Sequence, residues 1–95
     1  MPVYMIIDIT VQNREVYSQY VAQVPAIIQK YGGRYLARDG HIIPLSGSWN
    51  PERLVLIEFE TIEQFHRCFQ SPEYRALAPL REQSTTSRTV LVGDC

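Results

Sequence analysis

Residues 53–81, RLVLIEFETIEQFHRCFQSPEYRALAPLR, decide the fold of this 95-residue chain. The first part is rich in β-branched and aromatic side chains, which predicts a strand over residues 53–59. The sequence T-I-E-Q that begins at Thr61 has the pattern of a capping box and predicts the start of a helix. Ser-Pro at 71–72 is typical of a second helix start. The stretch therefore predicts one strand followed by two helices.

Three further strands are predicted, at residues 3–11, 34–38 and 86–92, from the same enrichment in β-branched and aromatic side chains. Asp39-Gly40 predicts a bend after the second of these strands. Residues 41–45 could continue the ribbon beyond that bend, as an edge strand that tolerates a proline. The segment that follows, Ser-Gly-Ser-Trp-Asn-Pro, has the composition of a turn.

A long helix is predicted between the first two strands. Asn13 is a suitable N-cap, and apolar residues then recur at three-and-four spacing as far as Tyr31. We expect a kink near Pro25, because proline removes a backbone donor, and a left-handed stop at Gly32-Gly33. The order of elements predicts one α+β domain over residues 1–95. Its fold should be ferredoxin-like βαββαβ, with a four-stranded antiparallel sheet and the helices on one face.

The composition is that of an ordinary globular protein. Hydrophobic residues make up 45% of the chain and charged residues 20%, which argues against disorder. The net charge of −1 gives no general attraction to nucleic acid, and no apolar run is long enough for a membrane span. Two cysteines do not make a disulfide framework, and no secretory signal is apparent. We therefore expect a cytoplasmic protein.

Apolar side chains occupy both faces of the two central predicted strands. One face of the first strand carries Val3, Met5, Ile7, Ile9 and Val11, and the other carries Tyr4, Ile6, Asp8 and Thr10. In residues 53–59 the second face carries Leu54, Leu56 and Glu58. The helices can cover only one face, and leaving the apolar residues of the other in water would forfeit several kcal/mol. We therefore expect a homodimer that forms through the open face of the sheet.

Five short motifs resemble one known family. They are Tyr-Gly-Gly-Arg-Tyr-Leu-Ala-Arg at 31–38, Trp-Asn-Pro at 49–51, Ile-Glu-Phe at 57–59, Ser-Pro-Glu-Tyr at 71–74 and Val-Gly at 92–93. The chain resembles the domain-of-unknown-function 1330 family, a branch of the dimeric α+β barrel superfamily. The resemblance implies a homodimer and brings no established reaction. Relatives with this barrel include cofactor-free monooxygenases, small-ring isomerases and haem enzymes, so the fold does not select a chemistry.

Asp8 and Glu58 are the candidate catalytic residues. If their strands are neighbours, both carboxylates face the space between subunits, where partial burial would raise their pKa and suit them to proton transfer. The alternative, which we favour, is that each pairs with a cation such as Arg34, Arg38 or Arg53 and fixes the register of the dimer.

The candidate ligand-binding residues are Tyr4, Arg34, Arg38 and Trp49. The two arginines lie four apart on a predicted strand, and therefore on one face, where they could clamp a carboxylate. The alternative is a solvated edge strand whose charges prevent edge-to-edge pairing. Tyr4 and Trp49 could line the wall of a pocket for a planar or apolar molecule.

No metal site or cofactor motif is predicted. His41 and His66 lie on different elements without ligand spacing, and we expect His66 to be a half-buried packing residue. Cys68 is expected to be a small apolar helix residue. The first hypothesis is a homodimeric small-molecule-binding protein, which as an enzyme would act without cofactor on a small organic molecule. The alternative is a non-catalytic binding or stress-associated module whose charged residues only set the dimer register.

Overall fold

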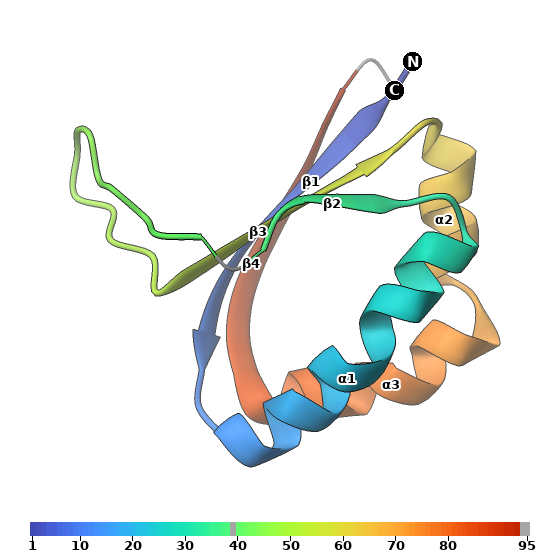
Figure 1. Ribbon diagram of the computed structural model, residues 1–95, viewed down its shortest axis with the longest axis horizontal. Coiled ribbons are helices and arrows are strands. Elements are labelled where there is room, and N and C mark those ends of the chain that lie inside the picture. Colours follow the sequence, from blue (N-terminus) through green and yellow to red (C-terminus); the bar gives the residue numbers. More distant parts are fainter. Residues whose placement is uncertain (39, 94–95) are drawn as a thin grey trace.

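The computed structural model describes residues 1–38 and 40–93 (Figure 1). Its elements are β1 (Val3–Val11), α1 (Arg14–Lys30), β2 (Arg34–Ala37), β3 (Arg53–Phe59), α2 (Ile62–Phe69), α3 (Pro72–Ser84) and β4 (Thr85–Gly93). This order is the predicted one, with β2 one residue shorter than expected and β4 one residue longer at each end. The predicted sequence of strands and helices is confirmed.

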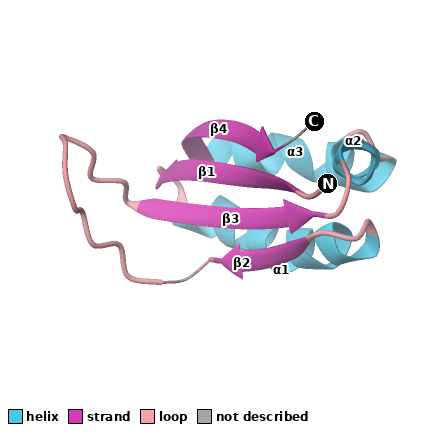
Figure 2. Cartoon of the chain, turned by 90° about the horizontal axis from the view of Figure 1, so that it is seen from above, coloured by secondary structure: helices cyan, strands magenta, loops and turns pink. Residues whose placement is uncertain are grey.

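The four strands form one antiparallel sheet in the order β2-β3-β1-β4. All three helices lie on the same side of this sheet, as Figure 2 shows from above. One layer of strands is therefore covered by one layer of helices. The α+β, ferredoxin-like fold class is confirmed.

The core fills the space between these two layers. Val3, Met5 and Ile9 of β1 are buried there, as are the alternate residues of β3 that end at Phe59. The apolar stripe of α1 meets them with four buried side chains, namely Tyr17, Tyr20, Val24 and Ile28. Since the side chains of a strand alternate between faces, the same pairing directs the intervening residues to the uncovered side. The predicted core face of both central strands is confirmed.

Side-chain caps begin all three helices. The side chains of Asn13, Thr61 and Ser71 each accept a hydrogen bond at 3.1 Å from a backbone N–H in the first turn of their helix. These are the three predicted N-caps. Pro25 does not end α1, which continues as one helix to Lys30. The helix stops where Gly32 adopts a φ of +88°, a conformation that glycine reaches without strain.

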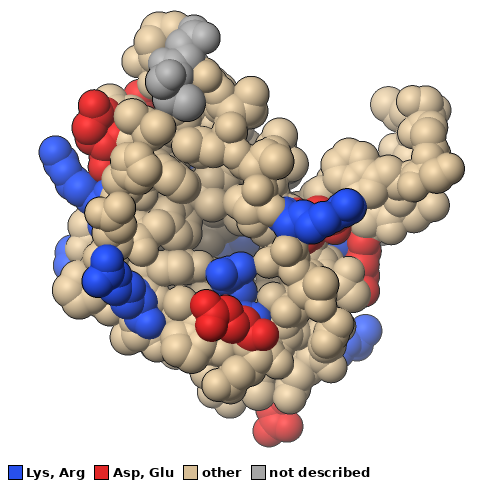
Figure 3. All heavy atoms as spheres, turned by 180° about the vertical axis from the view of Figure 1, so that it is seen from behind, with Lys and Arg blue, Asp and Glu red and all other residues tan. Residues whose placement is uncertain are grey.

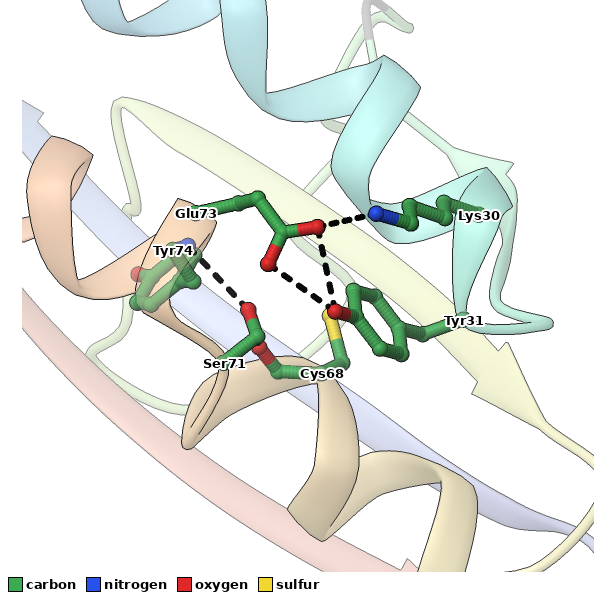
Figure 4. A network of polar contacts seen from close by, with 6 residues as sticks. All are labelled: Lys30, Tyr31, Cys68, Ser71, Glu73 and Tyr74. Carbon is green, nitrogen blue, oxygen red and sulfur yellow. Dashed lines mark hydrogen bonds and ion pairs between the residues drawn. The ribbon is translucent and has the colours of Figure 1, made fainter.

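A polar cluster ties the end of α1 to the start of α3 (Figure 4). The carboxylate of Glu73 accepts hydrogen bonds from the Tyr31 hydroxyl at 3.0 and 3.1 Å and forms an ion pair with Lys30. Ser71 donates a hydrogen bond to the Cys68 carbonyl at 2.6 Å while it caps α3. Two of the motifs that resemble the family, at 31–38 and 71–74, therefore meet here and hold the helices in place over the sheet.

Three expectations need correction or qualification. Residues 41–45 do not continue the ribbon: no strand includes them, and they belong to a loop that extends beyond the sheet (Figures 1 and 2). Asp39, the first residue of the predicted bend at 39–40, lies outside the described residues. His66 is exposed rather than half-buried, although its ring contacts that of Phe65 at 5.2 Å. Among the described residues, no helix has the length and apolar character needed to cross a membrane.

Candidate functional site

Most of the predicted site residues lie on the face of the sheet that the helices leave uncovered, here called the outer face. It carries Tyr4, Ile6, Asp8, Leu54, Leu56, Glu58, Arg88, Val90 and Val92. Asp8 Oδ2 accepts hydrogen bonds from Arg88 Nη2 at 2.7 Å and from Trp49 Nε1 at 2.9 Å. The Arg88 guanidinium, followed by the indole, holds the pKa of Asp8 below its usual range. The expectation of a raised pKa at Asp8 is therefore wrong.

Glu58 also has a cationic partner. Its Oε1 accepts a hydrogen bond from Arg34 Nε at 2.8 Å across the β2–β3 pair. Tyr4 lies directly opposite Glu58 on β1, and a hydrogen bond with that carboxylate raises the pKa of the tyrosine. This pairing of Glu58 with Arg34 is one of the ion pairs that the sequence analysis favoured over a catalytic role.

The two carboxylates share a face but form two separate groups. Tyr4 pairs with Glu58, and Asp8 lies four residues further along β1. At about 3.4 Å per residue this separation is about 14 Å. Asp8 and Glu58 therefore cannot act as an acid and a base on one reacting atom, and ligand binding at Tyr4, Arg34 and Trp49 stays a prediction.

Arg34 and Arg38 do not share a face. The register between β2 and β3 shifts between Tyr35 and Ala37, so that Ala37 pairs with Leu56 where a regular strand would bring Val55. Such a bulge adds one residue and reverses the side to which later side chains point. Arg34 lies on the outer face, whereas the guanidinium of Arg38 lies 4.6 Å from the ring of Tyr35 and lines the helix side. The predicted joint clamp is wrong for this reason.

A cavity of about 320 Å³ lies between the sheet and the helices. Its apolar wall is formed by residues of β1, β3, α1 and α2, including Met5, Ile7, Val24, Ile28, Val55, Ile57, Phe65 and Phe69. Its polar lining consists of Tyr17, Tyr20, Tyr35, Tyr74, Thr89, Arg38, Arg53 and Arg81. Figure 3, which views the molecule from behind, shows a hollow near the centre of this face, with Lys or Arg atoms in it and an Asp or Glu side chain at its rim.

Two buried tyrosines join α1 to α3 in the wall of this cavity. The hydroxyls of Tyr20 and Tyr74 lie 2.9 Å apart, and either can be the donor. Burial raises the pKa of Tyr20 far above its ordinary value, and burial also raises that of Tyr35 to about 12. Both hydroxyls therefore stay protonated at neutral pH and can donate hydrogen bonds.

Three arginines reach the cavity from different elements. The guanidinium of Arg53, at the start of β3, lies 5.6 Å from the ring centroid of Tyr17. Arg81, near the end of α3, donates a hydrogen bond from Nη1 to the Ser87 hydroxyl at 3.0 Å. Arg38 follows β2 and stacks over Tyr35. Each guanidinium is thus positioned by a neighbouring side chain at the cavity wall.

A second, more open hollow adjoins the first. It shares Tyr17, Val21, Arg38 and Arg53 with the cavity, and it adds residues from the start of α1 and from the loop before β3. The added charged residues are Arg14 and Glu52. This hollow, called the mouth below, thus shares four wall residues with the cavity.

This arrangement suits an organic molecule with few polar groups. Apolar walls exclude water, while tyrosine hydroxyls and guanidinium groups present donors that fix orientation. The described lining offers no histidine, carboxylate or thiol to accept a proton near neutral pH. Cys68 is fully buried outside the lining, and burial raises the pKa of its thiol to about 11, which confirms it as a packing residue. Among the described residues no His, Cys, Asp or Glu cluster is arranged to hold a metal ion.

The sequence contained a signal for this cavity. Arg53 is in phase with the buried positions of β3, and Arg81 follows Leu77 by four residues on the buried side of α3. A cation that continues an apolar stripe is expected either to be paired or to face a polar ligand. Tyr17 and Tyr20 belong to the buried stripe of α1 and also line the cavity.

Solved structures with this fold differ widely in sequence. A protein of unknown function from Rhodopseudomonas palustris, RPA0582, superimposes with a TM-score of 0.83 over 99% of this chain and 82% of its own, at 16% identity. SnoaB, a cofactor-independent oxygenase from Streptomyces nogalater, superimposes with a TM-score of 0.68 over 99% of this chain and 93% of its own, at 17% identity. A putative antibiotic biosynthesis monooxygenase from Nitrosomonas europaea superimposes with a TM-score of 0.63 over 99% of this chain and 98% of its own, at 15% identity. At these identities the likeness shows the fold alone.

No curated protein is significantly similar to the chain in sequence. The family model of a domain of unknown function, DUF1330, matches residues 2–95, which includes all the motifs that carried the resemblance. The chain therefore belongs to the DUF1330 family.

Proposed function

We propose that this protein is a homodimer that binds a small organic molecule in the cavity between its sheet and its helices. The observation that supports this most strongly is the cavity itself, which combines apolar walls with tyrosine and arginine side chains. Its volume of about 320 Å³ is at the lower end of the range of small-molecule sites. The ligand would therefore have about the size of a single ring with a short substituent. The cytoplasmic location predicted from the cysteine content is part of this proposal.

The dimer would form through the outer face. Val90 and Val92 of β4 are 59% and 52% exposed in the protomer, and Ile6, Leu54 and Leu56 beside them are half-buried. Together they make an apolar surface that a second copy can cover by packing sheet against sheet.

The ion pairs on the outer face would then set the register of this interface. Asp8 with Arg88, and Glu58 with Arg34, are already joined within one protomer. Trp49 is 49% exposed, donates a hydrogen bond to Asp8 and lies in a loop that extends beyond the sheet. Tyr4, Arg34 and Trp49 would contact the second copy, and Arg38 alone of the predicted ligand-binding residues would contact the ligand.

Cofactor-independent chemistry on the bound molecule is the second candidate function. The fold is shared with SnoaB, which is described as a cofactor-independent oxygenase. Among the described residues, the cavity lining supplies proton donors from Tyr20 and Tyr35 and no histidine, carboxylate or thiol. We therefore place binding first, since a reaction here would depend on the acidity of the substrate itself.

A pair of valine substitutions on α1 tests the location of the site. Val21 is half-buried and lines both the cavity and its mouth, whereas Val16 is half-buried on the same helix and lines neither. A set of single-ring organic molecules is screened by ligand-observed NMR against wild type, Val21→Phe and Val16→Phe. Binding that is lost in Val21→Phe and kept in Val16→Phe supports the cavity. Binding that survives Val21→Phe, or no binding to the wild type, contradicts the proposal.

A further inference from the structure

We propose that the cavity selects carbonyl compounds. The hydroxyl pair of Tyr20 and Tyr74, with Arg81 beside it, binds the carbonyl oxygen, and the flat apolar body of the ligand lies against α2. This inference deepens the proposed function and rests on it. It concerns the chemical class of the ligand, which neither the fold nor the family membership supplies.

The first argument is a hydroxyl hydrogen without an acceptor. Tyr20 and Tyr74 are both buried, and their hydroxyl oxygens lie 2.9 Å apart. The pair carries two hydroxyl hydrogens, and the bond between them uses one. Among the described residues, no other group forms a hydrogen bond with either hydroxyl. The second hydrogen therefore lacks an acceptor, which is unusual for a buried polar group and calls for a bound molecule that supplies one.

The second argument is a similar deficit at Arg81. Its Nη1 donates a hydrogen bond to the Ser87 hydroxyl at 3.0 Å, whereas its Nε is buried and has no acceptor in the described part of the chain. Burying a donor without an acceptor is costly, because its bond to water is lost and nothing replaces it. Two donors in the wall of one cavity thus lack acceptors, namely a hydroxyl of the tyrosine pair and Arg81 Nε.

These two donors lie close together. Tyr74 and Arg81 are seven residues apart on α3, which is about two turns, so they share a face of the helix with the buried Leu77 between them. Tyr20 meets this face from α1 through its hydrogen bond to Tyr74. Burial, the larger effect, raises the pKa of Tyr20, and the charge of Arg81 acts in the opposite direction, as a cation near a hydroxyl does. The hydroxyl pair and the guanidinium are therefore neighbours.

One carbonyl oxygen can satisfy both donors. It carries two lone pairs in the plane of its substituents and accepts hydrogen bonds from two directions. The described lining contains side-chain hydroxyls and guanidinium groups but no aspartate, glutamate, asparagine or glutamine. A ligand that brings an acceptor therefore fits this lining better than one that brings a donor.

The surface beside the tyrosine pair is aromatic. The ring of Phe69 meets that of Tyr74 edge to face, with centroids 4.6 Å apart, and the ring of Phe65 lies 5.2 Å from that of Phe69. Both phenylalanines come from α2 and line the cavity. Flat rings pack favourably against such aromatic edges and faces. A molecule that fits both surfaces has a carbonyl group next to an aromatic or other flat apolar body.

The test compares a ketone with its hydrocarbon isostere. The probes are acetophenone and α-methylstyrene, in which a CH2 group replaces the carbonyl oxygen with little change in shape. Their dissociation constants are measured at pH 7 by ligand-observed NMR on the wild type, the double variant Tyr20→Phe/Tyr74→Phe, and Arg81→Met. The matched controls are Tyr4→Phe, on the outer face, and Arg75→Met, at an exposed arginine of α3, since neither residue lines the cavity.

The proposal predicts that the wild type binds acetophenone more tightly than α-methylstyrene, because the hydrocarbon leaves buried donors unpaired. The double tyrosine variant should reduce this preference by about 10-fold, the effect of one lost hydrogen bond. Arg81→Met should also reduce it, and provides a result even if the double variant does not fold. A residue that only supports the fold would weaken binding of both probes together and leave the preference unchanged. The two controls should keep the wild-type preference.

Two kinds of result overturn the inference, and they can be told apart. If α-methylstyrene binds the wild type as tightly as acetophenone, or if either cavity variant keeps the wild-type preference, carbonyl binding at this site is wrong although the cavity remains a ligand site. The same holds if acetophenone does not bind while other molecules of the screen do. If no molecule of the wider screen binds the wild type, the proposed function fails and the inference fails with it.

Discussion

The hydroxyls of Tyr20 and Tyr74 lie 2.9 Å apart and join α1 to α3 at the wall of the cavity. Their rings meet edge to face, with centroids 6.3 Å apart. The hydrogen bond therefore links the two longest helices at the wall of the cavity.

Removing either hydroxyl should destabilise the protein. Tyr20→Phe and Tyr74→Phe should each lower the free energy of unfolding by about 1–3 kcal/mol, because the remaining buried hydroxyl loses its partner. The double variant should lose less than the sum, since no unsatisfied hydroxyl remains. Urea unfolding of the four proteins measures this coupling. Strictly additive losses would show that the two hydroxyls do not interact.

The tether between α1 and α3 should make stability depend on pH. The ion pair with Lys30, first, and the hydrogen bond from Tyr31 hold the pKa of Glu73 below its ordinary value of 4.5. Stabilisation from a depressed carboxylate is complete above about pH 4.5 and is lost as the pH falls through the folded-state pKa. Glu73→Gln should therefore lower the melting temperature at pH 7. The difference in melting temperature between this variant and the wild type should become smaller toward pH 3.

The control for this prediction is Glu82→Gln, at an exposed carboxylate on the same helix. It should leave the pH dependence of the melting temperature unchanged. A difference between Glu73→Gln and the wild type that stays constant from pH 7 to pH 3 would contradict the role assigned to the ionised carboxylate.

Gly33 should not tolerate a side chain. A Cβ at this position would lie 2.7 Å from Ile28 Cγ2 and 2.7 Å from the ring of Phe59. Both neighbours are buried, so Gly33→Ala should cost about 1–3 kcal/mol of stability through overpacking. Gly40→Ala, where a Cβ meets nothing within 4 Å, should be neutral or slightly stabilising. Equal urea midpoints for the two variants would count against the close packing of this turn.

The outer face should be the dimer interface. Val90→Asp places a charge on its exposed β4 strand and should convert the dimer to monomers at micromolar concentration, as measured by sedimentation velocity. Ala76→Asp, at an exposed position of α3 on the helix side, should leave the dimer intact. A wild type that sediments as a monomer would contradict the sheet-to-sheet dimer.

The architecture could be predicted from the sequence because its signals are local. The caps at Asn13, Thr61 and Ser71 and the alternation in β1 and β3 each depend on a few neighbouring residues. The faces of the central strands followed from the same alternation. These features needed no knowledge of contacts across the chain.

The site was harder to predict because it depends on relationships across the sheet. The bulge between Tyr35 and Ala37 moves Arg38 to the helix side, and no glycine or proline in β2 marks it. The assignment of Asp8 depended on an unforeseen partner, Arg88, 80 positions away in the sequence. Apolar stripes were interpreted as filled core, whereas part of the space between them is a cavity.

Methyl NMR tests the central claim, that the ligand lies between the sheet and the helices, most directly. The methyl groups of Val24 and Ile57 line the cavity, and those of Ile6 and Val90 lie on the outer face. On titration with a single-ring organic molecule that the screen identifies as a ligand, the resonances of Val24 and Ile57 should shift with saturation while those of Ile6 and Val90 stay in place. Shifts confined to Ile6 and Val90 would place the ligand on the outer face and contradict the account.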